Sequence, residues 1–318
     1  MGKVALVDFA KDFVVLSSLA ILRPDSARIS SAFLKHLMQS PAFLDEALGK
    51  KTGVAIRRII LRNLKSIPVS VPSLTEQQRI VRILDEALDG IGAAKANTEK
   101  NLQNARAVFE SYLQSVFIQR GEGWVEKRLE DIARDFGRGK SKHRPRNDPK
   151  LYGGNYPFIQ TGDVRSSNHM IESYSQTYND VGLAQSKLWP AGTLCITIAA
   201  NIAETGILAF DACFPDSVIG VVVDERNISN KFLEYLLQSF KVHLQAQGKG
   251  SAQANINLGT FETQLFPFPS LFEQNRIVKT FDALREETQR LASLYERKLA
   301  ALEALKKSLL HQAFTGSL

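Results

Sequence analysis

Two groups of lysine and arginine side chains carry the clearest chemistry in this chain. Guanidinium and ammonium groups at this density suit the phosphates of a nucleic-acid backbone, so each group predicts phosphate contacts. The alternative for each is a loop that contacts only water. The first group is Lys50, Lys51, Arg57, Arg58, Arg62 and Lys65, and the second is Arg138, Lys140, Lys142, Arg144, Arg146 and Lys150.

The sequence carries no recognisable catalytic motif. It has no GxxxxGK[ST] phosphate loop, no glycine-rich turn suited to S-adenosylmethionine and no Asn/Asp-Pro-Pro-aromatic tetrad. Asp216, Asp224 and Glu225 are better explained as solvated strand ends than as a nuclease cluster. Cys195 and Cys213 are expected to be buried, reduced thiols, because their spacing fits no metal pair. We therefore expect no catalysis by this chain, and neither a cofactor nor a metal bound to it.

Composition indicates a folded protein of about two domains. The chain has 318 residues, 44% of them hydrophobic, and a net charge of +7. No segment approaches the roughly 18 uninterrupted apolar residues of a membrane span, and the first residues do not form a signal peptide. The expectation is a soluble, cytoplasmic protein with no membrane partner.

A tandem repeat organises the chain. PSLTEQQRIV at 72–81 and PSLFEQNRIV at 269–278 share eight of ten residues at an offset of 197. FLKHLMQS at 33–40 resembles FLEYLLQS at 232–239 at an offset of 199. Residues 1 to about 120 therefore repeat residues from about 205 to 318, and the first copy lacks a counterpart of residues 124–204.

Each copy ends in a predicted amphipathic helix of about 45 residues. Apolar residues recur at the 3.5-residue spacing of a coiled coil along 74–122 and again along 271–318. Thr75 is the expected N-cap of the first helix. Because neither helix has a core of its own, the simplest solution is that the two pair antiparallel as a spacer.

The segment between these helices predicts a mixed α/β domain. Runs rich in Val, Ile and Thr at 193–198 and 218–223 indicate strands, and 231–245 indicates an amphipathic helix. The fold class is α+β, with a complete domain, a partial second one at the N-terminus and a coiled-coil spacer. The partial domain is expected to keep a strand-like start, a helix at 31–40 and a basic stretch. The predicted divisions are 1–73, 74–122, 123–270 and 271–318.

The order of several short segments resembles one known family, the specificity subunits of type I restriction-modification systems. Each segment is a weak signal by itself, but their order and the helix-ended repeat make the likeness strong over nearly the whole chain. The segments are YPFI at 156–159, TGDV at 161–164, GTLCI at 192–196, GKGSAQANI at 248–256, PFP at 267–269, EQNRI at 273–277 and HQAFTG at 311–316.

The resemblance implies a target-recognition domain that reads half of a split DNA site and helices that dock modification subunits. Those subunits methylate adenine, so S-adenosylmethionine is expected on the partner and not on this chain. A restriction subunit and a second copy of the chain are further possible partners. One alternative is a structural or regulatory fragment that binds the modification subunit without reading DNA. Another is an enzyme that acts on DNA by itself.

Base reading is expected from polar side chains in the loops of the complete domain, while the 138–150 loop contacts phosphates. The alternative for each candidate is a loop residue that faces water. Each candidate reader has a polar side chain and lies in a predicted loop beside a glycine. They are Gln160, Thr161, Arg165, Ser166, Asn168, Asn201 and Lys249.

Overall fold

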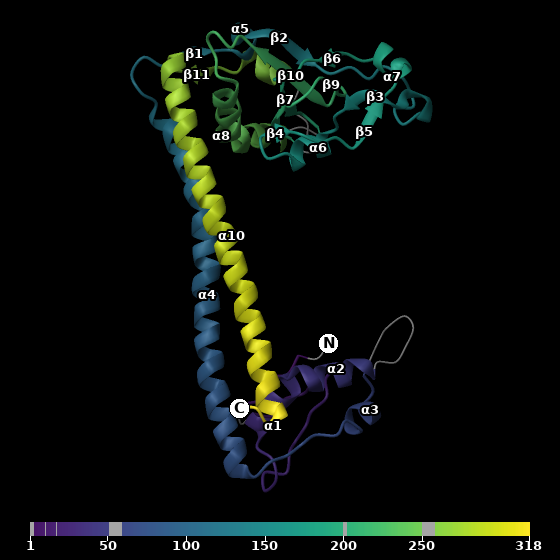
Figure 1. Cartoon of the computed structure of the whole chain (residues 1–318), viewed down its shortest axis with the longest axis vertical. Coiled ribbons are helices and arrows are strands. Elements are labelled where there is room, and N and C mark those ends of the chain that lie inside the picture. Colours follow the sequence, from purple (N-terminus) through teal and green to yellow (C-terminus); the bar gives the residue numbers. More distant parts are fainter. Residues whose placement is uncertain (1–2, 10, 17, 51–58, 200–201, 250–257) are drawn as a thin grey trace. The chain divides into compact units, whose positions relative to one another are not determined.

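A computed structural model describes the backbone of residues 3–9, 11–16, 18–50, 59–199, 202–249 and 258–318 (Figure 1). Side chains are described for all of these except 242–249 and 260. The chain forms two compact units, one of residues 1–105 with 290–318 and one of residues 106–289. The sequence placed domain boundaries at the ends of the long helices, whereas the units of the structure divide within both helices.

Both long helices are present. Helix α4 (Leu74–Gln119) has 46 residues and α10 (Leu271–Thr315) has 45, so each is about 70 Å long at 1.5 Å per residue. Within each unit, residues later in α4 contact residues earlier in α10. The predicted antiparallel pairing is therefore confirmed within each unit. In the first unit Leu84 shares a core with Leu310, and Lys95 lies 2.5 Å from Glu303. In the second unit the Phe117 and Phe281 ring centroids are 5.9 Å apart, and the Arg285 guanidinium lies 4.4 Å from the Phe109 ring centroid.

Serines, and not the predicted Thr75, stand at the N-cap position of the long helices. Because α4 begins at Leu74, the Ser73 hydroxyl accepts the backbone N–H of Glu76 at 3.3 Å. Ser270 accepts the N–H of Glu273 at the same distance at the start of α10. The expectation of Thr75 was wrong by two residues, and the cap lies at equivalent positions of the two repeats.

A buried glutamine ties each long helix to the chain before a shorter helix. Gln274 is 1% exposed; its amide donates to the carbonyls of Asn227 and Pro269, and its oxygen accepts the Ser229 N–H at 2.8 Å. In the first unit Gln77 makes the same set of bonds to Arg28, Pro72 and Ser30. The repeat seen in the sequence is therefore a repeat of this junction.

Replacing Gln274 by alanine is expected to lower the free energy of unfolding by about 1–3 kcal/mol, because it leaves a buried N–H and two carbonyls without partners. Chemical denaturation of the full chain measures this. Asn275→Ala changes the exposed neighbouring residue and serves as the control. Equal stability of the two variants would show that the junction contributes nothing.

The first unit is helical wherever its described residues form regular structure. A small core joins α1 to both long helices, with Phe33 and Phe314 rings 5.3 Å apart. The short helices of the unit are α1 (Ser31–Gln39), α2 (Pro41–Gly49) and α3 (Leu61–Lys65).

The strand-like start predicted for the first unit is absent, since none of its described residues forms a strand. In the second unit the equivalent strand β10 (Val218–Val223) pairs with β2 (Ala133–Arg138) and β7 (Leu194–Thr197) on either side. Those neighbours come from the part of the repeat that the first copy does not match. An apolar strand without ladder partners has no sheet to join, so Leu19 and Leu22 stay 60% and 44% exposed.

The second unit is the mixed α/β domain that the sequence predicts (Figure 1). A five-stranded sheet has the order β2-β10-β7-β8-β4, a four-stranded sheet the order β5-β3-β9-β6, and β1 pairs with β11. The remaining strands are β1 (Val125–Lys127), β3 (Tyr152–Phe158), β4 (Met170–Ile171), β5 (Gln176–Tyr178), β6 (Leu188–Trp189), β8 (Thr205–Leu208), β9 (Ala212–Cys213) and β11 (Phe266–Phe268).

Helices cover the sheets and connect them. Helix α8 (Asn230–Lys249) confirms the predicted amphipathic helix and packs Phe232 and Leu236 into the same core as Ile196 and Val221. Cys195 and Val218 face the other way, into a second core, so the five-stranded sheet is buried on both sides. The other elements are α5 (Leu129–Ile132), η1 (Pro149–Leu151), α6 (Thr161–Ser166), α7 (Asp180–Ala184) and α9 (Leu258–Thr263).

Cys195 and Cys213 are both free and buried, as predicted, and burial raises the pKa of each thiol. Among the residues that the structure describes, no helix is long and apolar enough to cross a membrane.

Candidate nucleic-acid interface

The second basic group lies between the end of β2 and η1, and its arginines are partly occupied. Arg138 Nε donates to the Asp216 carbonyl at 2.7 Å, and the Arg146 guanidinium contacts both Asp216 carboxylate oxygens at 2.6 and 2.8 Å. Arg144 donates to the carbonyls of Ser141 and His143. These bonds hold the arginines in place, and the Asp216 carboxylate offsets part of their charge.

The loop is anchored on the two residues that follow α7. The His143 N–H donates to Gln185 Oε1 at 2.9 Å, and the Ser186 hydroxyl donates to the Lys140 carbonyl at 2.8 Å. The His143 ring hydrogen-bonds Asp148 at 2.9 Å, and this bond lowers the pKa of the Asp148 carboxyl from its usual range. The loop therefore has a defined backbone path from which Lys140 can project.

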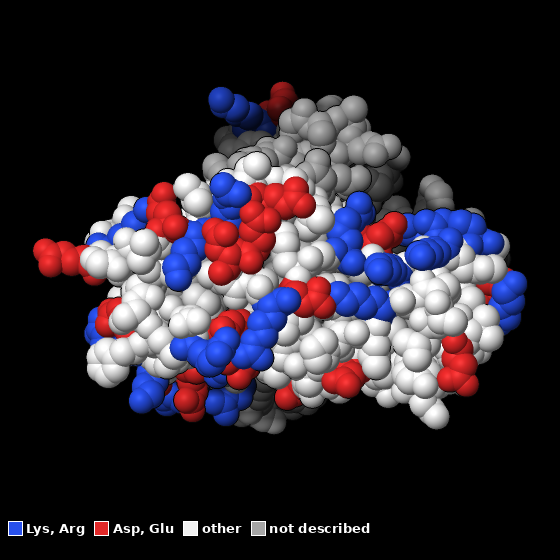
Figure 2. Space-filling model, turned by 90° about the horizontal axis from the view of Figure 1, so that it is seen from above, with Lys and Arg blue, Asp and Glu red and all other residues white. Residues whose placement is uncertain are grey.

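Lys140 and Lys142 are the two cations of this loop with the most available charge. Both are exposed, and among the described residues neither has a carboxylate partner at ion-pair distance. Lys150, by contrast, lies 3.1 Å from Asp148. In Figure 2, which shows one face of the molecule from above, Lys and Arg side chains gather in a stretch at the right, interrupted by acidic side chains. Such a surface suits a polyanion with regularly spaced charges.

The first basic group is only partly described. Lys51, Arg57 and Arg58 lie outside the described residues. Lys50 pairs with Glu46 at 3.1 Å, while Arg62 and Lys65 lie exposed on α3.

The candidate readers lie at the end of β3, and four of them form or cap a helix. Gln160 precedes α6, its backbone N–H donating to Asp163 at 2.8 Å, and α6 contains Thr161, Arg165 and Ser166. The loop predicted there was wrong, because Asp163 at the third helical position caps the turn. Arg165, Ser166 and the following Asn168 have exposed side chains, whereas Gln160 and Thr161 are half-buried.

The basic loop and the reader group lie at opposite ends of β3. The loop leads through η1 into the start of this strand, and α6 follows its last residue. The strand does not run straight between the two groups, because Tyr152 and Tyr156 both pair with Tyr178 and the Tyr152 and Phe158 rings lie 6.1 Å apart. Of the other two candidates, Asn201 and the side chain of Lys249 lie outside the described residues.

Two of the three acidic residues considered as a nuclease cluster, Asp216 and Asp224, form ion pairs with arginines. Asp216 pairs with Arg146, and Asp224 pairs with Arg226 and Arg134, whose hydrogen bonds depress the pKa of the Asp224 carboxyl. Among the described residues no three His, Cys, Asp or Glu side chains come together as a metal site.

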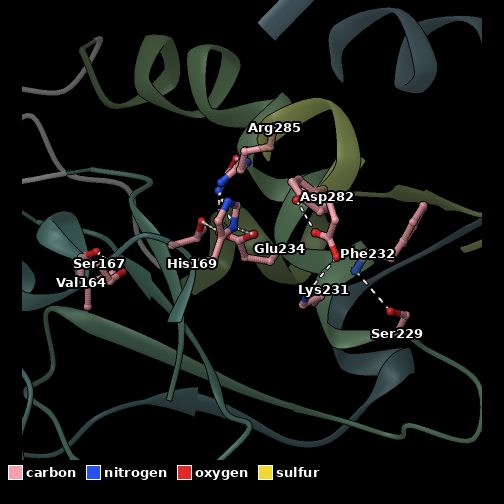
Figure 3. A network of polar contacts seen from close by, with 12 residues as sticks. Val164, Ser167, His169, Ser229, Lys231, Phe232, Glu234, Asp282 and Arg285 are labelled. Carbon is pink, nitrogen blue, oxygen red and sulfur yellow. Dashed lines mark hydrogen bonds and ion pairs between the residues drawn. The ribbon is translucent and has the colours of Figure 1, made fainter. Parts of the chain in front are cut away.

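A buried polar network behind the readers was not predicted from the sequence (Figure 3). His169, which follows Asn168, has its ring nitrogen Nδ1 against Glu234 on α8. Glu234 is 1% exposed and also accepts hydrogen bonds from Thr205 at 3.1 Å and Gln238 at 2.5 Å. Gln238 in turn accepts from Arg285 of α10 at 3.0 Å.

A second group of polar contacts joins α8 to α10. The Tyr235 hydroxyl donates to Asp282 at 2.7 Å, and Lys231 lies 2.8 Å from the same carboxylate. Burial raises the Asp282 pKa, but the hydrogen bonds from Lys231 and Tyr235 outweigh it, so the net shift is downward. Burial lowers the pKa of Arg285, whose guanidinium lies over the Phe109 ring.

The repeat held a signal for this network. Glu234 is an acid on the otherwise apolar side of a helix, and its equivalent in the first copy is Lys35. Arg285 likewise replaces Leu88. A comparison of the copies would have singled out both charges, but not His169, which has no equivalent there.

The match to a known family covers most of the chain. Residues 1–103 and 121–297 match the family described as the type I restriction modification DNA specificity domain. A protein of Methanocaldococcus jannaschii described as a type I restriction enzyme specificity subunit is 23% identical over 334 residues. That alignment covers 100% of this chain and 75% of the relative.

Solved structures have the same fold. A structure reported for the assembly and conformational transition of the type I restriction-modification system matches with a TM-score of 0.78 at 19% identity, covering 93% of this chain and 74% of that one. The HsdS subunit of Thermoanaerobacter tengcongensis matches with a TM-score of 0.61 at 19% identity, over 92% and 71% of the two chains. The family match over most of its length shows that this chain belongs to the type I restriction-modification DNA specificity family, whose members are non-catalytic specificity subunits.

Proposed function

We propose that residues 123–270 read one half of a split DNA site on behalf of a modification subunit that methylates adenine. In this proposal Lys140 and Lys142 contact phosphates. Arg165, Ser166 and Asn168 reach base edges, with Gln160 and Thr161 holding their position at the start of α6. Arg138, Arg144 and Arg146 shape the loop and add charge beside the backbone. Asn201 and Lys249 remain candidate readers.

The arrangement around β3 is the observation that carries the proposal. The basic loop precedes this strand and carries exposed cations that have no carboxylate partner among the described residues. Exposed polar side chains on the short helix α6 follow the strand. Phosphate contacts at one end would set the register, and base contacts at the other would discriminate sequence.

The methyl donor and the catalytic groups belong, in this proposal, to the partner. S-adenosylmethionine is bound by the modification subunit, and this chain contributes DNA recognition and a docking surface. The paired helices α4 and α10 supply that surface, because long exposed faces remain on both after they pair. A restriction subunit joins the same assembly when cleavage is required.

Mapping of methylated adenines in cells that express this chain with its modification subunit tests the proposal. We expect methylation at one defined motif, and a relaxed or shifted motif when Arg165 or Asn168 is replaced by alanine. The exposed Lys306→Ala variant on α10 serves as the control and should keep the motif. Methylation without a motif, or a motif unchanged by both reader variants, would contradict base reading by this domain. A palindromic split motif would indicate that two copies act together.

Co-elution of the purified chain with the modification subunit in gel filtration tests the docking part separately. Separate elution at micromolar concentrations would rule out stable docking while leaving the DNA-reading proposal open to the methylation map.

A further inference from the structure

The turn that carries Asn168 is strained and is held from behind. His169 has a φ of +72°, a conformation that L residues rarely adopt, although Asn, Asp and His do so more often than the others, and that glycine adopts freely. Its carbonyl accepts the Ile207 N–H of β8 at 2.7 Å, and Asn168 pairs with Met170 as an isolated bridge. Backbone strain of this kind persists only where surrounding contacts enforce it, and it is commonly part of a functional site.

The side chain of His169 adds contacts that hold the turn. Its ring points from the turn toward Glu234 on α8 (Figure 3). Glu234 is almost fully buried, and its carboxylate also accepts hydrogen bonds from Thr205 and Gln238. Arg285 of α10 completes the chain of hydrogen bonds through Gln238. A glycine would fit the backbone of this turn better than a histidine, so the side chain itself is what the position requires.

The packing of α8 on α10 does not require this network. The scaffold pair Tyr235–Asp282 has its equivalent in the first unit, where the His36 ring bonds Asp85 at 2.7 Å. Glu234 and Arg285 correspond to Lys35 and Leu88, and that unit still packs its short helix on the long one. The buried acid and its cation are therefore additions that serve the complete domain.

We propose that His169 is a positioning residue for DNA readout. It holds the Asn168 turn against Glu234 and, through Gln238 and Arg285, against the long helix α10. This inference rests on the proposed reading of DNA by residues 160–168. The network makes the turn rigid, so that the Asn168 amide is presented in one orientation. Rigid presentation of a reading side chain sharpens discrimination between bases without adding a contact.

The test compares variants in the complex with the modification subunit, using a library of duplexes with randomised cores and one mixed-sequence duplex. His169→Gly removes the anchor and relieves the backbone strain, so the fold should be kept; a thermal melt confirms this. We expect a loss of about tenfold in preference at the base pair that Asn168→Ala also relaxes, the size of one base contact. Affinity for the mixed-sequence duplex should stay unchanged.

Two further variants separate positioning from general packing. Glu234→Gln should relax the same base pair, and the double variant with His169→Gly should be no worse than His169→Gly alone, since both act through one contact. Lys231→Ala is the matched control and should keep the preference. Lys231 lies on α8, as Glu234 does, and its replacement breaks the ion pair with Asp282 of α10.

Three results would contradict either this proposal or the proposed function. A His169→Gly complex that keeps full preference at the base pair relaxed by Asn168→Ala overturns it. If Asn168→Ala relaxes no base pair while Arg165→Ala does, the turn does not read DNA and this proposal fails, although the proposed function stands. If no variant of residues 160–168 changes any preference, the proposed function itself fails.

Discussion

Replacing Lys140 and Lys142 together by glutamine is expected to weaken binding to every DNA sequence by a factor of about 60 at 0.1 M monovalent salt. Each phosphate contact scales as the salt concentration to the power of about −0.9, which gives a factor of roughly 8 per contact at that concentration. The plot of log affinity against log salt should therefore become shallower by about 1.8. Fluorescence anisotropy with a labelled duplex, measured across a salt series, gives both quantities.

The specificity of this double variant should be unchanged, because phosphate contacts carry no sequence information. Lys306→Gln with Lys307→Gln removes the same net charge from two exposed positions on α10 and is the matched control. Equal losses in the two double variants would mean that total charge, and not the 138–150 loop, determines the affinity. An unchanged slope for Lys140 and Lys142 would remove this loop from the interface.

Replacing Phe281 by alanine is expected to lower the free energy of unfolding by about 3–5 kcal/mol, the usual cost of truncating a buried aromatic side chain. Phe281 is 0% exposed, and its ring packs against Phe109 and Phe117 of α4 and Tyr235 of α8, with centroids 4.9 to 6.2 Å away. Its loss leaves a cavity where α4, α8 and α10 meet. Differential scanning calorimetry of the full chain measures the effect.

Phe272→Ala on the same helix is the control, because the Phe272 side chain is 81% exposed and its removal should change stability by no more than about 0.5 kcal/mol. Similar melting curves for the two variants would show that the aromatic cluster does not hold the helices together in this unit. The expected contrast would instead locate the stability of the second unit in the contacts between α8 and the helix pair.

The long helices, their antiparallel pairing and the repeat were predictable because they depend on local and periodic information. A 3.5-residue apolar spacing sustained over some 45 residues has few other solutions. The strand 218–223 was equally plain, since an unbroken apolar run suits a sheet buried on both faces. The order of family-like segments, read with the repeat, also led to the correct family.

Only the tertiary structure decided how the polar residues are used. The helix α6 was missed because its cap, Asp163, outweighs the glycine beside it. The occupation of Arg146 by Asp216, 70 residues later in the chain, follows from the fold and not from spacing. The start of the first unit shows the converse, because an apolar pattern does not become a strand without neighbouring strands to share its hydrogen bonds.

The chain sequence by itself determined the helical spacer, the complete domain and the basic loop, because each depends on residues close together in the sequence. The anchoring of His169 by Glu234, 65 residues later in the chain, was decided by the tertiary structure. A buried acid is stable only where the fold brings it donors. The identity of those donors, unlike the period of a helix, cannot be read from the residues around Glu234.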